Sequence, residues 1–125
     1  MSGKKILLVE DDRDLLFLMN KKLTDEGFLV IKAETGQQAL DILPKEKPDL
    51  VLLDILLPDI DGLTVLNEIA NHPEVKNTPV IILSNLADQG SLEQAAAVGE
   101  YEYLVKAKTD LSEVVDHIRK KLKLN

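Results

Sequence analysis

Cysteine and tryptophan are absent from this chain of 125 residues, and aromatic residues make up only 3% of it. Without cysteine, a disulfide framework, a thiolate metal site and a cysteine nucleophile are all excluded, and a reducing intracellular setting fits. The five prolines and six glycines form no low-complexity segment. No apolar run approaches the roughly 18 residues of a membrane span, and the N-terminus lacks the apolar core of a secretory signal. We therefore expect a soluble cytoplasmic protein.

Positive charge is also scarce, since 15 Lys and Arg face 22 Asp and Glu, for a formal net charge of −7. Such a chain repels a phosphate backbone, which argues against direct nucleic-acid binding and against a membrane surface. The basic cluster at 119–123 is instead typical of the last turn of a helix, where cations complement the helix dipole. The length and the 45% apolar content fit one domain, which we expect to span residues 1–125 with no output domain.

Two hydrophobic periodicities alternate along the chain. Short apolar runs predict strands at 5–10, 28–33, 49–54, 79–84 and 101–106. Apolar residues at helical spacing predict helices at 14–23, 36–43, 62–71, 88–98 and 110–123. This alternation predicts a parallel sheet with helices on both faces, and the two strands of mixed sequence, 28–33 and 101–106, are expected at its edges. Pro44 is expected to end the second helix, and Asp110 and Glu113 to cap the last one.

Polar residues stand where the predicted strands end, at the edge of an open parallel sheet where ligands bind. They are Glu10 and Asp11 after the first strand, Asp54 after the third, Ser84 after the fourth and Lys106 after the fifth. Carboxylates that lie 4 Å apart repel by about 4 kcal/mol at an effective dielectric near 20, so a compensating cation is needed. Mg²⁺ suits such an oxygen-rich cluster, and Lys106 supplies a second positive charge.

Helix capping is the simpler interpretation for some of the acids. We favour Asp12 as the N-cap of the first helix. Asp54 differs because it ends a fully apolar strand and no helix starts directly after it. Asp59 or Asp61 is better placed for capping, so Asp54 is the acid that needs a functional explanation.

These features together resemble the receiver domain of two-component response regulators, and the resemblance covers nearly the whole chain. The matching segments are "ED" (Glu10, Asp11), "D-x-x-x-P-x-x-D-G" (Asp54, Pro58, Asp61, Gly62), Ser84, and "YLVK" (Tyr103 to Lys106). The resemblance implies a flavodoxin-like doubly wound sheet of strand order 2-1-3-4-5. It also implies a phosphorelay receiver whose partners are a histidine kinase or phosphotransfer protein.

The resemblance assigns a role to each matching residue. Asp54 corresponds to the phosphoacceptor. The Mg²⁺ (or Mn²⁺) ligands would be Asp54, Asp11, the backbone carbonyl of Leu56, and Glu10 through a water. Such a domain catalyses its own phosphorylation and dephosphorylation without being a free-standing turnover enzyme.

A second set of matching residues concerns the response to phosphorylation. Ser84 corresponds to the hydroxyl that moves to the phosphoryl oxygen, Lys106 to the lysine that pairs with it, and Tyr103 to the aromatic switch residue. The resemblance implies that the switched surface is formed by the fourth helix, fifth strand and fifth helix. A downstream target or a second copy of the chain would bind there.

The chain departs from the family pattern at two positions. Asn85 follows Ser84 where a small residue is usual, and we expect it to narrow access to the phosphoryl group or to bond its oxygens. Ala107 follows Lys106 where proline is typical, which leaves open whether this peptide bond is cis or trans. Leu56 and Leu86 offer no polar side chain to place an attacking water, so we predict slow self-dephosphorylation.

Three alternatives stay open at this point. A flavodoxin-like cofactor-binding module would need a phosphate loop where this chain has acids. A Mg²⁺-dependent phosphohydrolase with an aspartyl-phosphate intermediate commonly has a second acid near the nucleophile, where this chain has Leu56. A degenerate pseudo-receiver that acts only as a protein-interaction module is disfavoured by the complete set of site residues.

Overall fold

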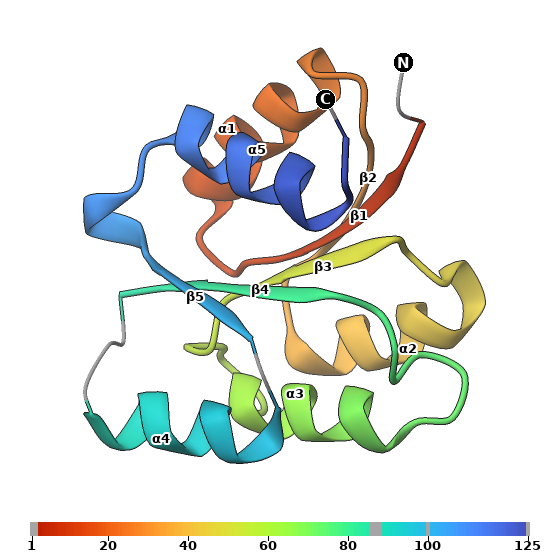
Figure 1. Cartoon of the computed structure of the whole chain (residues 1–125), viewed down its shortest axis with the longest axis vertical. Helices are drawn as coiled ribbons and strands as arrows, with labels where there is room; N and C mark the ends of the chain where they lie inside the picture. The colour runs from red at the N-terminus through yellow and green to blue at the C-terminus, as the bar shows by residue number, and fades with distance from the viewer. Residues whose placement is uncertain (1–2, 86–88, 100, 125) are drawn as a thin grey trace.

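A five-stranded parallel sheet forms the centre of the molecule, in the order β2-β1-β3-β4-β5 (Figure 1). The structure, a computed structural model, describes residues 3–85, 89–99 and 101–124. The strands are β1 (Lys5–Val9), β2 (Leu29–Ala33), β3 (Leu50–Leu53), β4 (Val80–Ser84) and β5 (Glu102–Val105). The predicted flavodoxin-like order is confirmed, and the two strands of mixed sequence lie at the edges as expected.

The register of the strands brings their carboxyl ends level with one another. Val9 of β1 pairs with Leu53 of β3, so Glu10 and Asp54 leave adjacent strands at the same height. The Asp54 N–H continues the ladder by donating to the Val9 carbonyl at 3.1 Å. The four residues of β3 are fully buried, because a central parallel strand is covered on both faces. An apolar strand that ends in an acid is thus a strand that delivers a carboxylate to the edge of the sheet.

Helices cover both faces of the sheet, with α1 and α5 on one face and α2, α3 and α4 on the other (Figure 1). Their bounds are α1 (Arg13–Asp25), α2 (Gly36–Glu46), α3 (Gly62–Asn71), α4 (Gln89–Val98) and α5 (Leu111–Lys121), and a short 3₁₀ turn, η1 (Lys106–Lys108), follows β5. Each face has its own apolar core, in which Met19 of α1 and Ile118 of α5 pack on one side, and Leu43 of α2 and Leu66 of α3 on the other. No helix in the described ranges is long and apolar enough to cross a bilayer.

The predicted N-caps of α1 and α5 are present. Asp12 accepts hydrogen bonds from the N–H groups of Asp14 and Leu15 at the start of α1, and Asp110 and Glu113 form a reciprocal capping box on α5. The expected end of α2 at Pro44 is wrong, because the helix continues to Glu46. Pro44 has no N–H to donate to the Leu40 carbonyl, so one helical hydrogen bond is missing, yet the helix runs on through Lys45 and Glu46. Lys47 follows as the C-cap: its N–H still donates to the Leu43 carbonyl in the helical pattern, and its left-handed backbone (φ 45°) turns the chain out of the helix.

Candidate functional site

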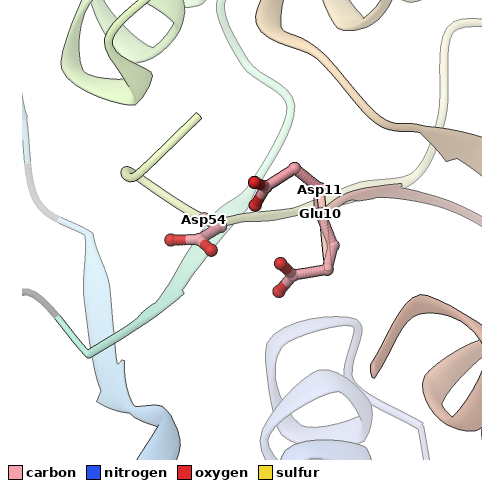
Figure 2. A group of neighbouring side chains, drawn as sticks. All are labelled: Glu10, Asp11 and Asp54. Atoms are coloured by element: carbon pink, nitrogen blue, oxygen red, sulfur yellow. The ribbon is translucent and has the colours of Figure 1, made fainter. Parts of the chain in front are cut away.

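Three carboxylates gather where β1 and β3 end (Figure 2). Glu10, Asp11 and Asp54 each place an oxygen within 4.8 Å of the others, which makes them a candidate site for a metal ion. Glu10 and Asp54 are 2% and 4% exposed, whereas Asp11 is exposed to solvent. Two nearly buried carboxylates side by side are costly unless cations compensate for them.

Lys106 supplies one of the compensating charges. Its ammonium nitrogen lies 2.6 Å from Asp54 Oδ2 and 2.5 Å from Glu10 Oε1, and its side chain is only 16% exposed. The residue reaches this position because it follows β5 directly, and the turn η1 begins with it. The structure therefore brings together the four charged residues that the sequence predicted: Glu10, Asp11, Asp54 and Lys106.

The surroundings shift the protonation equilibria of two of these groups. Burial raises the pKa of Glu10 above its usual range, with a further contribution from the Asp54 charge, although hydrogen bonds from Lys106 and the Asp12 N–H act in the opposite direction. Burial alone would lower the pKa of Lys106, but its hydrogen bonds to Asp54 and Glu10 outweigh that effect and raise it. Lys106 is thus held as an ammonium, and the carboxylate cluster favours any further cation that offsets the buried negative charge.

The loop from β3 to α3 is fixed close to Asp54. The Leu56 N–H donates to Asp54 Oδ1 at 3.0 Å, which orients the carboxylate. At the other end of the loop, Asp61 caps α3 by accepting from the Leu63 N–H at 2.9 Å, so the predicted capping role of Asp61 is confirmed. Gly62 packs so tightly that a Cβ there would lie 2.7 Å from the Asp54 carbonyl oxygen. The glycine is needed for this close approach.

Asp59, the other predicted capping candidate, caps a different helix from the one that follows it in the chain. Its carboxylate accepts from the N–H groups of Gly36 at 2.8 Å and Gln37 at 2.9 Å, at the start of α2 rather than of α3. These bonds, chiefly the one from Gln37, lower the pKa of Asp59. The loop that follows the candidate phosphoacceptor is thereby tied to a second helix.

The predicted switch residues lie on β4 and β5, and the predicted modulating residue Asn85 directly follows β4. Ser84 is the fully buried last residue of β4, and Tyr103 is half-buried on β5, paired with Ile82. Asn85 accepts a hydrogen bond from the Ala107 N–H at 2.9 Å. No peptide bond within the described ranges is cis, so the Lys106–Ala107 bond is trans. Leu86 lies outside the described residues.

The donor set fits a hard divalent cation. Mg²⁺ prefers oxygen ligands and typically binds through one or two carboxylates, with waters completing its octahedron. Asp11 and Asp54 provide such carboxylates, and the exposed position of Asp11 leaves room for water. The absence of nitrogen and sulfur donors from the cluster disfavours a softer transition metal.

Comparison with known proteins gives the same family from sequence and from structure. The family profile described as response regulator receiver domain matches residues 6–119. Sporulation initiation phosphotransferase F of Bacillus subtilis is 35% identical over 124 residues, which are 99% of this chain and 98% of that protein. The transcriptional regulatory protein CpxR of Escherichia coli is 39% identical over 115 residues, but these are 92% of this chain and only 47% of CpxR.

Solved structures agree with the family assignment. A CheY-like receiver domain protein from Methanospirillum hungatei superposes with a TM-score of 0.89 at 27% identity, over 96% of this chain and 94% of that one. The receiver domain of the sensor histidine kinase PA1611 from Pseudomonas aeruginosa, solved with a magnesium ion in its active site cleft, has a TM-score of 0.87 at 28% identity, over 97% of this chain and 98% of that one. This chain therefore belongs to the response regulator receiver family, the phosphorelay receivers of two-component systems.

Proposed function

We propose that residues 1–125 act as one receiver unit that accepts a phosphoryl group on Asp54. Receivers of this family interact with histidine kinases or phosphotransfer proteins, and one of these is the proposed donor. The observation that carries the proposal is the contact of Lys106 with Asp54 at 2.6 Å, next to two further carboxylates. A buried acid that contacts a cation and belongs to a candidate metal-binding cluster is equipped for phosphoryl transfer.

In the proposed reaction an oxygen of Asp54 attacks phosphorus in line with the leaving group. A new oxygen–phosphorus bond forms, and the bond to the donor nitrogen breaks with its electron pair left on the donor imidazole. A carboxylate nucleophile needs no general base. Lys106 remains an ammonium, because its two carboxylate contacts raise its pKa, and it neutralises charge on the transferred phosphoryl oxygens.

Receivers of this family bind Mg²⁺ in the acidic pocket, and this chain offers a fitting set of ligands. We propose Asp11, Asp54 and the backbone carbonyl of Leu56 as direct ligands, with Glu10 acting through water. When bound, Mg²⁺ neutralises negative charge on the phosphoryl oxygens. Glu10 is already held by Lys106 and by the Asp12 N–H at 3.0 Å, which supports an indirect role for it. Mn²⁺ is proposed to substitute for Mg²⁺.

The proposed output is a change on the surface formed by α4, β5 and α5. Ser84 and Lys106 would gather around the added phosphoryl group, and Tyr103 would turn inward as the end of β4 moves. The proposed equilibrium is between an inactive and an active conformation of this surface. A shift of that equilibrium from 1:99 to 99:1 requires the active conformation to bind the phosphoryl group about 5.5 kcal/mol more tightly, which several charge-assisted contacts to a dianion can supply. A downstream target or a second copy of the chain would bind the switched surface.

The test is intact-protein mass spectrometry after incubation with acetyl phosphate or phosphoramidate and Mg²⁺. We expect the mass of the protein to increase by one phosphoryl group, and we expect Asp54→Ala to abolish the increase. Asp41→Ala, which removes an exposed acid of α2, is the matched control and should still be phosphorylated. If the folded wild-type protein gains no mass with either donor, the chain is a pseudo-receiver and the proposal is wrong.

A further inference from the structure

A side-chain hydrogen bond joins β4 and β5 beyond the end of their ladder. The last paired residues of the two strands are Ser84 and Val105. One residue after Ser84, the Asn85 Oδ1 accepts from the Ala107 N–H at 2.9 Å. This contact links the residue that follows Ser84 to the turn that contains Lys106.

The Ala107 N–H belongs to a turn that has no cap of its own. The first N–H groups of a helical turn have no partner within it and need one from elsewhere. Val105, which precedes η1, makes no side-chain capping bond. Asn85, which directly follows β4, provides the missing acceptor. A residue next to β4 therefore caps the turn η1, which follows β5.

The two residues of this contact are the two positions at which the sequence departs from the family pattern. A small residue in place of Asn85 could not reach across to the turn, and a proline in place of Ala107 would have no N–H to donate. The hydrogen bond therefore requires both departures, and we propose that Asn85 is a positioning residue that holds the backbone of Lys106.

The contact matters for the site because Lys106 lies between two residues whose backbones are held in place. On one side Val105 is held in the β4–β5 ladder, and on the other side Ala107 is held by Asn85. With both neighbours fixed, the lysine backbone is fixed too, and its side chain meets Asp54 and Glu10 at 2.6 and 2.5 Å. Loss of the Asn85 bond would release one side of the turn. Its catalytic consequence rests on the proposed function, but the bond itself does not.

The first test needs no phosphorylation. Amide hydrogen exchange of Ala107, followed by NMR, should become roughly two- to tenfold faster in Asn85→Ala, the range expected for the loss of one hydrogen bond. Asn85→Asp retains the acceptor oxygen and should preserve the protection, whereas Asn71→Ala removes a remote surface amide of α3 as the control. Equal exchange rates in the wild type and Asn85→Ala would overturn the proposal.

The second test asks whether Asn85 acts on the lysine side chain. Competitive labelling with an amine-reactive reagent, followed by peptide mass spectrometry, should show more labelling of Lys106 in Asn85→Ala than in the wild type. Lys108, an exposed lysine of the same turn, serves as the internal reference and should not change. Unchanged labelling of Lys106 would contradict a positioning role even if the amide exchange responds.

The third test separates this role from general loss of structure. Asn85→Ala should slow phosphorylation by acetyl phosphate roughly two- to tenfold, and it should have no further effect when Lys106 is already alanine. An equal loss in both backgrounds would mean that Asn85 does not act through Lys106, which would overturn the proposal. If the wild type is not phosphorylated at all, the proposed function fails, while the exchange and labelling tests still decide the role of Asn85.

Discussion

The substitution Lys106→Met should measure how much the lysine ammonium contributes to the free energy of unfolding. Methionine keeps most of the apolar stem but removes the ammonium from between Glu10 and Asp54. At 2.6 and 2.5 Å and an effective dielectric near 20, each contact is worth about 6 kcal/mol of gross Coulomb energy. Desolvation offsets much of this, and removal of one partner from a buried ion pair typically costs about 3 to 5 kcal/mol. We expect a decrease of that size in the free energy of unfolding at pH 7 without Mg²⁺.

The loss of stability in Lys106→Met should be larger at neutral pH than in acid. Burial already raises the pKa of Glu10, and removal of the ammonium, which lowers it, should raise it further above the unfolded value. A carboxyl of this kind favours folding below its unfolded pKa and opposes folding as the pH rises through its folded pKa. The difference between the wild type and Lys106→Met should therefore be largest at neutral pH and should shrink in acid. Added Mg²⁺ should shrink it as well, because the ion binds the folded carboxylates.

Urea unfolding of both proteins, at neutral and acid pH and with and without Mg²⁺, measures these effects. The matched control is Lys21→Met, which removes an exposed lysine that pairs with Asp25 at 3.1 Å on the surface of α1. Exposed pairs contribute about 0 to 1 kcal/mol, so the control should change little. If Lys106→Met were no less stable than Lys21→Met, or if its deficit were the same at both pH values, the charge balance described for this pocket would be wrong.

Other predictions concern the loop, the last helix and the lifetime of the phosphoryl group. Gly62→Ala should lower the free energy of unfolding by about 1 to 3 kcal/mol in urea unfolding, because the new Cβ would meet backbone atoms. Gly36→Ala should lower it less, because the new Cβ would meet the movable side chain of Ile60. Asp110→Ala should cost about 0.5 to 2 kcal/mol through loss of the α5 cap, and an unchanged unfolding midpoint would argue against that capping role. The phosphoryl group on Asp54 should be long-lived, because the apolar side chain of Leu56 cannot position a water molecule for hydrolysis. A half-life of only seconds, measured by mass spectrometry, would contradict this.

The position of the acidic pocket could be predicted because it follows from local rules. A strand buried on both faces must be apolar, so the acid that ends the run at 49–54 marks the point where the strand leaves the core. The carboxyl ends of parallel strands lie at one edge, so Glu10, Asp54 and Lys106 were expected to converge, and the structure places them in contact. The helix caps at Asp12 and Asp110 were predictable for the same reason, since their partners lie within three residues.

Contacts between distant segments could not be predicted in this way. The bonds from Gly36 and Gln37 to Asp59 span more than 20 residues, and no spacing rule connects a loop after β3 to the start of α2. The contact between Asn85 and Ala107 depends on how β4 and β5 end side by side. The sequence identified both residues as departures from a pattern, but only their relative positions show that they form one contact.

That contact bears on how the site could respond to a phosphoryl group. Phosphorylation adds negative charge to a pocket that already holds three carboxylates, so the nearby cation and hydroxyl must approach the new oxygens. Among the described residues, the ion pairs of Glu10 and Asp54 are with Lys106. If Asn85 ties the turn of Lys106 to the end of β4, a shift of Ser84 must carry its neighbour Asn85 and that turn with it. The end of β4 and the turn after β5 would then move as one unit, so a variant that breaks the Asn85 bond should uncouple phosphorylation from the change at Tyr103.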